Sequence, residues 1–387
     1  MKLNRIRVLV TGVAALTIGF YAETAFSGSN NNPVNTAVEK GTKWLASVQG
    51  KDGGWGQDGG ETSYVRDGER LESNGNDVAN TAVAAEALLR GGREYREQVQ
   101  RAVEFILQRV EQSPDEGLAV TNANGTQIQR KLGPYIDTFL TSKLLAELDG
   151  TMDDARTNAR VRHSLQKCVA KIEKNQLKDG SWNVGGGWAP ILGTSMASRS
   201  LFIAQGKGVA VSEMAMAKVD TFTRTDGTHL GSGAGGGSAM SSSGGTAGIG
   251  GGVGSGAGAM TFKVTDGSAG VNLYSGAQQL EQLSRTDADR AKNKDQIAVI
   301  TKELSNPKFV AGFGSIGGEE FFSYLNISDS LRRTGGPEWA KWNNDMKAKI
   351  LSLQNADGTW SGQHCITGRV AVTSAAILLL IADRDGK

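Results

Sequence analysis

Residues 49–55 read QGKDGGW, a stretch in which a tryptophan follows a run of helix-breaking glycines. The same spacing of Gln, Asp-Gly and Trp recurs in QLKDGSW at 176–182 and in QNADGTW at 354–360. The tryptophans of the three copies are separated by intervals that divide into two and three units of about 60 residues, which indicates an internal repeat.

Each copy follows a stretch with apolar residues at helical spacing, such as 37–49 and 159–176. The Asp-Gly pair ends that helix, because glycine tolerates the left-handed conformation of a helix C-cap. A second kind of helix, rich in alanine, serine and threonine, comes after each copy. Small side chains allow close packing on several sides, so we expect this second kind to lie inside.

The two kinds of helix alternate along the whole chain. Polar, outer helices are expected at 37–49, 94–112, 155–175, 209–223, 287–304 and 338–353. Apolar, inner helices are expected at 76–92, 135–150, 191–208, 271–285, 319–336 and 368–386. Six outer-inner pairs predict an all-α fold, a single α6/α6 toroid occupying 37–387; an open helical solenoid is the alternative.

The Gln-x-x-Asp-Gly-x-Trp signature resembles the QW motif of squalene and hopene cyclases and, more loosely, the repeats of protein prenyltransferase β subunits. The chain is similar, over roughly 37–385, to this prenyltransferase/squalene oxidase repeat superfamily. The resemblance implies the toroid and assigns a structural role, locking one repeat to the next, to the repeat anchors Gln49, Trp55, Gln176, Trp182, Gln354 and Trp360.

The chemistry of those relatives is not matched. Their cyclases protonate an alkene with the central acid of an Asp-x-Asp-Asp motif, and the nearest match here is Asn74-Gly75-Asn76-Asp77. An amide cannot supply the proton that general acid catalysis requires. A zinc site built from Asp, Cys and His has one candidate, His364-Cys365 with Asp357, but neighbours in an extended loop point apart. We therefore expect no metal and no cofactor.

Parallel inner helices place their N-termini around one mouth of a toroid. The candidate catalytic residues at that mouth are Asp77, Asp137, Glu320 and Arg369, with Glu319 and His364 nearby. Paired carboxylates can serve glycoside hydrolysis. Acidic residues in a first helical turn also cap free N–H groups, which is the alternative explanation.

The first 27 residues have the pattern of a secretory signal peptide, with Lys2, Arg5 and Arg7 before an apolar run at 8–20. An uncleaved anchor is the alternative; after cleavage no stable membrane span is expected. The chain is thus expected to be exported to the periplasm or beyond, with a flexible N-terminus at 28–36.

Residues 231–260 are nearly half glycine and predict a long flexible insert in the toroid. A formal net charge of +2 argues against nucleic acid as a partner. The leading hypothesis is a binding or interaction module for an apolar small molecule, a glycan or a protein, without cyclase chemistry. The alternative is a secreted enzyme acting at the acidic mouth on an isoprenoid-like lipid or a polysaccharide.

Overall fold

The computed structural model describes residues 32–58, 64–66, 69–71, 75–182, 190–226, 269–312 and 315–384. The predicted signal peptide and the glycine-rich insert lie outside the described residues. Within the described parts of the chain, no helix is both long and apolar enough to cross a membrane.

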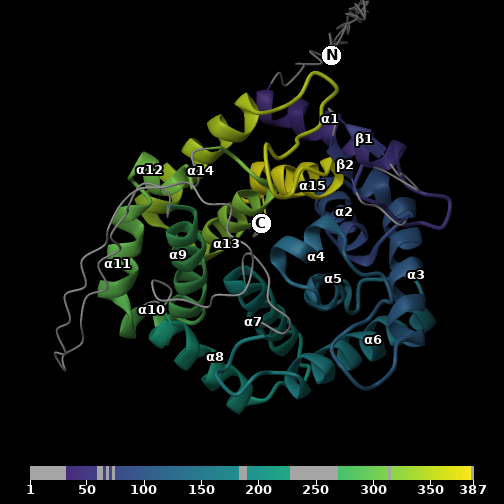
Figure 1. Ribbon diagram of the computed structural model, residues 1–387, viewed down its shortest axis with the longest axis horizontal. Helices are drawn as coiled ribbons and strands as arrows, with labels where there is room; N and C mark the ends of the chain where they lie inside the picture. Colours follow the sequence, from purple (N-terminus) through teal and green to yellow (C-terminus); the bar gives the residue numbers. More distant parts are fainter. Residues whose placement is uncertain are drawn as a thin grey trace, which may run out of the picture.

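The helices follow one another around a ring in the order of the sequence (Figure 1). The inner layer consists of α2 (Val78–Gly91), α5 (Ile136–Leu148), α7 (Pro190–Gly206), α9 (Ala269–Leu283), α13 (Gly318–Thr334) and α15 (Arg369–Leu380). Each of these helices contacts the next one in this order, and α15 contacts α2, so the inner layer is closed.

The outer layer packs against this inner ring. Its main helices are α1 (Pro33–Ser47), α3 (Arg96–Gln112), α6 (Ala155–Lys174), α8 (Glu213–Asp226), α11 (Lys294–Glu303) and α14 (Gly336–Ser352). The first and last of them, α1 and α14, are in contact. The expected all-α toroid is confirmed, while the number of six hairpins stays a prediction.

The remaining elements are short. They are η1 (Arg93–Tyr95), α4 (Gln127–Leu132), α10 (Asp287–Lys292), α12 (Pro307–Val310) and the antiparallel strands β1 (Tyr64–Arg66) and β2 (Glu69–Leu71). The predicted outer helix 287–304 is divided at Asn293, which ends α10. The first helix begins at Pro33, because the Asn32 side chain caps it, so residues 33–36 of the expected flexible N-terminus are helical.

The distribution of apolar residues explains the two layers. In α6 the buried residues follow one face and include Val161, Leu165, Cys168 and Ile172. In α15 every residue from Val370 to Leu380 is buried. A helix with an apolar stripe on one face lies in the outer layer, and a helix with apolar or small residues on all faces lies in the inner layer.

The tryptophans of the three repeat turns make the same contacts. Trp55, Trp182 and Trp360 donate their indole N–H to the carbonyls of Leu45, Ile172 and Ile350, at 2.8, 2.6 and 2.7 Å. Each of these carbonyls belongs to the outer helix that precedes the turn. The backbone N–H of each tryptophan is bonded to a threonine of the following inner helix, namely Thr81, Thr194 and Thr373.

The glutamines of the repeat turns reach the next outer helix. Gln49 donates to the carbonyl of Gln98 in α3, and Gln176 donates to that of Ala215 in α8, at 2.9 and 2.8 Å. The turn itself comes very close to that helix: a Cβ added at Gly180, where φ is +94°, would lie 2.2 Å from the carbonyl oxygen of Lys218. The glycine is therefore required both by its conformation and by this approach.

Candidate functional site

The N-termini of α2 and α5 meet at one mouth of the ring. Asp77 is the N-cap of α2, and Asp137 lies in the first turn of α5. Oδ1 of Asp137 accepts a hydrogen bond of 3.1 Å from the backbone N–H of Ala79 in α2. The structure thus brings two of the predicted site residues together.

Both carboxyl groups are buried and hold protons unusually tightly. Burial raises the pKa of Asp77 to about 7, and the negative charge of Asp137 adds to that shift. Burial likewise raises the pKa of Asp137 to about 6. Near neutral pH such groups can donate or accept a proton.

The same carboxyl oxygens are engaged in capping. Asp77 accepts from the backbone and the side-chain amide of Asn80, both at 2.8 Å. Oδ2 of Asp137 accepts from the amide of Gln129 in α4 at 2.6 Å. Asp137 also lines a pocket of about 250 Å³ between residues 119–124 and 134–138. Capping and proton exchange are therefore both compatible with this pair.

The short helix α4 lies over this mouth. Its Gln127 donates to the hydroxyl of Thr367 at 2.9 Å and accepts from the backbone N–H groups of Thr367 and Gly368, next to the start of α15. The helix also contacts α5 and α7 (Figure 1). Because α4 bridges these inner helices, it covers the acidic pair.

Asn76 stands at the place where the resemblance would require a proton donor. Its side-chain amide donates to Asp52 of the first repeat turn at 2.5 Å. This contact ties Asn76 to the turn between α1 and α2. No acid therefore stands at this position.

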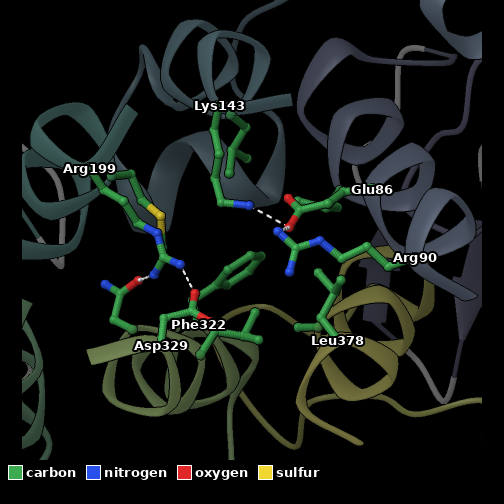
Figure 2. Close-up of a pocket in the computed structure, with 13 residues that line it drawn as sticks. Glu86, Arg90, Lys143, Arg199, Phe322, Asp329 and Leu378 are labelled. Carbon is green, nitrogen blue, oxygen red and sulfur yellow. Dashed lines mark hydrogen bonds and ion pairs between the residues drawn. The ribbon is translucent and has the colours of Figure 1, made fainter. Parts of the chain in front are cut away.

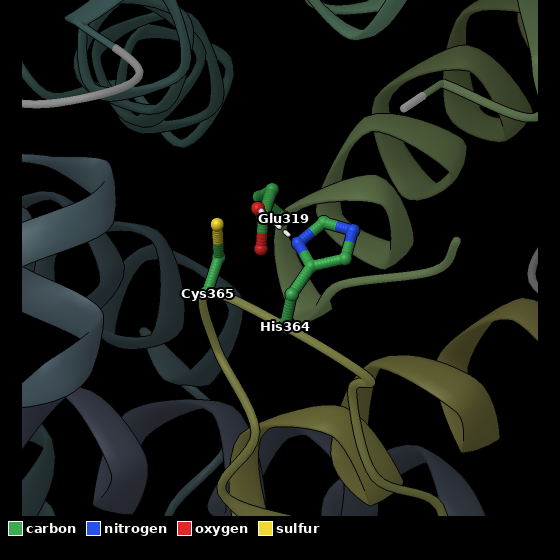
Figure 3. Close-up of side chains that lie close together, drawn as sticks. All are labelled: Glu319, His364 and Cys365. Carbon is green, nitrogen blue, oxygen red and sulfur yellow. Dashed lines mark ion pairs between the residues drawn. The ribbon is translucent and has the colours of Figure 1, made fainter. Parts of the chain in front are cut away.

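A second group lies at the N-terminus of α13. Glu319, His364 and Cys365 form the Glu–His–Cys cluster, whose potential ligand atoms all lie within 4.8 Å of one another (Figure 3). Nδ1 of His364 is 3.4 Å from Oε1 of Glu319, and its Nε2 is 3.9 Å from Oε1 of Glu320. The predicted residue Glu320 therefore adjoins this cluster.

The expectation that His364 and Cys365 point apart is wrong. Among the described non-glycine residues Cys365 alone has a positive φ, of 57°. This left-handed backbone turns the chain between the two residues, so both side chains face Glu319 (Figure 3). Asp357, the carboxylate considered with them from the sequence, instead accepts a hydrogen bond from Arg369.

Burial and neighbouring charges raise the pKa values of Glu320 and Cys365 in this region. Burial raises the pKa of Glu320 to about 7, with a further increase from Glu319 that His364 partly offsets. Burial and the neighbouring Glu319 raise the pKa of the Cys365 thiol to about 12. A protonated thiol is a poor nucleophile, so Cys365 is not activated for nucleophilic attack.

Arg369, another of the predicted site residues, is bonded to residues of the repeat turns. Its backbone N–H donates to Asp58 at 2.8 Å and its guanidinium to Asp357 at 3.0 Å. The guanidinium also lies 5.1 Å from the centre of the Trp44 ring. Arg369 therefore attaches the start of α15 to the repeat turns.

The interior of the ring holds charged residues that the sequence analysis did not single out. Lys143 of α5 is paired with Glu86 of α2 and with Glu147, the latter at 2.9 Å. On the opposite side Arg199 of α7 is paired with Asp329 of α13 (Figure 2). The sequence did contain an indication of this network, because ionisable residues interrupt the otherwise apolar ranges 76–92 and 135–150.

These side chains point into the interior of the ring (Figure 2). The cavity that they line, together with Phe322 and Leu378 among others, measures about 30 Å³ (Figure 2). This is about the volume of one liquid water molecule. Pockets for drug-sized ligands occupy about 300–1,000 Å³, so this cavity cannot accommodate a polyene.

Two comparisons identify similar proteins. Residues 17–132 match the family model described as the squalene-hopene cyclase C-terminal domain. A squalene–hopene cyclase of Bradyrhizobium diazoefficiens is 39% identical over 70 residues, which is 18% of this chain and 10% of that protein. The aligned region thus spans a tenth of the curated relative.

Proposed function

Since the chain belongs to the prenyltransferase and terpenoid-cyclase-like superfamily, we propose that it is an exported binding or interaction module built on that toroid and lacking cyclase chemistry. The carrying observation is the small, charged cavity that the described inner helices line. Ion pairs contributed by α2, α5, α7 and α13 line this cavity, and at about 30 Å³ it is too small for a polyene substrate.

The acid groups support the same conclusion. Alkene protonation needs a strongly donating acid facing the substrate cavity. Asn76 is an amide bonded to a surface turn, and Asp77 is used to cap α2. The proposed binding surface is accordingly the outside or the rim of the ring, which suits a protein or a glycan better than an apolar molecule held inside.

An assay with a polyene tests whether the protein lacks cyclase activity. The purified mature protein is incubated with squalene in detergent, and extracts are analysed by gas chromatography and mass spectrometry beside an active squalene–hopene cyclase. We expect squalene to be recovered unchanged. Cyclic products that disappear with Asp77→Asn would overturn the proposal.

The binding role is tested by native mass spectrometry of the protein purified from its own host. We expect a retained partner or glycan of defined mass, and no retained terpenoid.

The N-terminus of the same sample tests export. Cleavage near Gly28 and recovery outside the cytoplasm are expected, whereas an intact N-terminus in the cytoplasmic fraction would contradict export.

One observation favours a second function. The buried acids Asp77 and Asp137 have raised pKa values, and Asp137 lines a pocket of about 250 Å³. This combination would suit acid-base hydrolysis of a polysaccharide. Release of new reducing ends that is lost in Asp137→Asn but retained in the surface variant Glu39→Gln would favour the enzyme over the binding module.

A further inference from the structure

We propose that the pocket between residues 119–124 and 134–138 binds one neutral sugar residue of a glycan. This assignment rests on the proposed binding function and specifies the class of the ligand and the place where it binds. It requires no reaction, so it is separate from the hydrolysis considered for Asp77 and Asp137.

The size and depth of the pocket suit a single sugar ring. Its volume is about 250 Å³, just below the roughly 300–1,000 Å³ of pockets for drug-sized ligands. Val120, Asp137 and Thr138 are at most 1% exposed and lie at its bottom, whereas Asn122 and Asn124 are exposed at its rim. A sugar ring can therefore enter from solvent while the rest of a glycan chain stays outside.

The lining combines an aromatic ring with neutral hydrogen-bonding groups. Tyr135 is half-buried, and Thr121, Asn122 and Asn124 contribute one hydroxyl and two amides. A sugar ring has apolar C–H faces that pack against aromatic rings, and hydroxyl groups at its edge that can bond to amides. Tyrosine supplies rigid contact area and asparagine supplies adaptable hydrogen bonds, so this lining matches both parts of a sugar.

Three of these side chains have unused hydrogen-bonding capacity. Within the described parts of the chain, the Tyr135 hydroxyl and the amides of Asn122 and Asn124 have no hydrogen-bond partner in the protein. The hydroxyl of Thr121, by contrast, accepts from the backbone N–H of Ala123 at 3.1 Å and holds the turn of this segment. A ligand can therefore bond to the three free groups without breaking an internal hydrogen bond.

The two walls of the pocket are joined to each other. The hydroxyl of Thr138 donates to the carbonyl of Leu118 at 2.6 Å. The side-chain amide of Gln129 donates to the carbonyl of Ala123 at 3.0 Å and to Asp137 at 2.6 Å, so it connects both segments through α4. The pocket is thus formed before a ligand binds, and such preorganisation lowers the cost of binding.

The charge of the lining favours a neutral ligand. Among the described residues that line the pocket there is no Lys or Arg, so a phosphate or carboxylate group would lack its usual cationic partner. Both oxygens of Asp137 already accept hydrogen bonds, from the backbone of Ala79 and from Gln129, so a cationic ligand finds no free carboxylate there. A neutral sugar needs neither kind of charged partner.

Saturation-transfer NMR of the purified protein with defined sugars tests the assignment. The neutral probes are cellotriose, maltotriose and a trimer of N-acetylglucosamine, and the acidic counterpart is a trimer of galacturonic acid. We expect a neutral probe to bind, with the strongest saturation on the protons of one terminal ring, and the acidic probe not to bind. Binding of the acidic probe alone, or of no neutral sugar either in solution or on an array of neutral glycans, would overturn the sugar pocket. The binding function would still stand if native mass spectrometry retained a protein partner.

Variants of the lining residues locate the bound sugar. Tyr135→Ala should weaken binding by about tenfold or more, because a stacked aromatic ring contributes beyond its buried area. Asn122→Ala and Asn124→Ala should each weaken it by about two- to tenfold, as the loss of one hydrogen bond does. Ala119→Trp, at an exposed position of the lining, should abolish binding by filling the pocket. Isothermal titration calorimetry measures each affinity.

Two matched controls lie on α14. Asn344→Ala and Ala348→Trp make the same substitutions at exposed positions of that helix and should leave the affinity unchanged. Circular dichroism establishes that each variant is folded. Equal affinity of Ala119→Trp and Ala348→Trp for a neutral sugar would show that the sugar binds elsewhere, which would overturn the pocket but not the proposed binding function.

A measurement on the unmodified protein covers variants that do not fold. Hydrogen-deuterium exchange is followed by mass spectrometry with and without the neutral probe that binds best. We expect the probe to slow exchange of the backbone amides at 119–126 and 133–138, and to leave exchange in α14 unchanged. Unaltered exchange in both segments at a saturating concentration of the probe would contradict the sugar pocket whatever the variants do.

Discussion

The side-chain amide of Gln354 donates a hydrogen bond of 3.0 Å to the carbonyl of Ala37, across a sequence separation of 317 residues. Gln354 follows the last outer helix, α14, and Ala37 lies in the first, α1. The bond has the same form as that from Gln49 to Gln98 between α1 and α3. The contact that joins neighbouring outer helices therefore also joins the two ends of the ring.

Truncation of a repeat tryptophan should destabilise the protein strongly. Trp182 is 3% exposed, and its indole is bonded to Ile172. Trp182→Ala should lower the free energy of unfolding by about 3–5 kcal/mol, because a large cavity forms and a buried carbonyl loses its donor. Urea denaturation measures the loss. The partly buried Trp339 provides the control, and an equal loss in Trp339→Ala would argue against a special role of the repeat turn.

Asp77 should make stability depend on pH between about 4 and 7. Its folded pKa of about 7 lies above the ordinary value of 3.8, so the folded state binds the proton more tightly. The stabilisation is complete below pH 4 and is lost as pH rises through 7. Asp77→Asn keeps a capping side chain without the charge and should raise the free energy of unfolding at pH 8 by about 1–3 kcal/mol.

Asp154, the N-cap of α6, is the matched control for Asp77. It caps through Thr157 but is exposed, and that hydrogen bond lowers its pKa. Its contribution therefore has the opposite sign and is lost as pH falls. Denaturation at several pH values compares Asp77→Asn with Asp154→Asn, and an unchanged pH profile in Asp77→Asn would contradict the predicted coupling.

Removal of Lys143 should be costly, because two buried carboxylates would lose a partner. Burial alone raises the pKa of Glu147, but Lys143 and Arg90 together bring it down to about 2. Lys143→Met should cost about 3–5 kcal/mol at pH 7. Because the folded pKa of Glu147 is low, the wild type loses this stabilisation as pH falls from about 5 to 2, and the variant should lose less.

A double variant separates the charge effect from packing. Glu86→Gln combined with Lys143→Met should recover part of the loss, because the uncompensated charge is removed. Thermal and urea unfolding of the four proteins completes the cycle. Strict additivity would contradict a direct interaction between Glu86 and Lys143.

Both cysteines should be free thiols, even in the oxidising compartment to which the proposed export would take the protein. Cys168 lies on α6 and Cys365 follows α14, on well-separated arcs of the ring (Figure 1). A disulfide needs Cα atoms within about 7 Å. Thiol titration of the denatured, unreduced protein should give two thiols per chain. In the native protein the half-buried Cys365 should react slowly and the buried Cys168 still more slowly, and a bridge between them would overturn the closed ring.

Local chemistry made the repeat turns predictable. In QLKDGSW, Oδ1 of Asp179 accepts from the backbone N–H of Ser181, and Gly180 adopts a positive φ. These features depend on residues within a few positions of one another, so the sequence indicates where an outer helix ends. Alternating polar and small-residue helices likewise predicted two layers, because each composition suits one degree of burial.

Contacts between distant residues were decided by the tertiary structure. The sequence placed Asp77 and Asp137 at helix starts, but only the closed ring makes them neighbours and buries them under α4. It suggested Asp357 as the carboxylate for His364 and Cys365, whereas the fold supplies Glu319 and directs Asp357 to Arg369. The left-handed backbone at Cys365 could not be foreseen, because non-glycine residues seldom adopt it.

The sequence by itself thus determined the repeat, the helix types and the presence of an amide at position 76, because each depends on residue identity at short spacing. Only the tertiary structure decided that ion pairs line the interior cavity and that Glu319, His364 and Cys365 converge. Lys143 and Glu86 lie on different helices, and their charges are stable inside the ring only because each finds the other there. Such pairing depends on the relative placement of helices, which local sequence patterns do not encode.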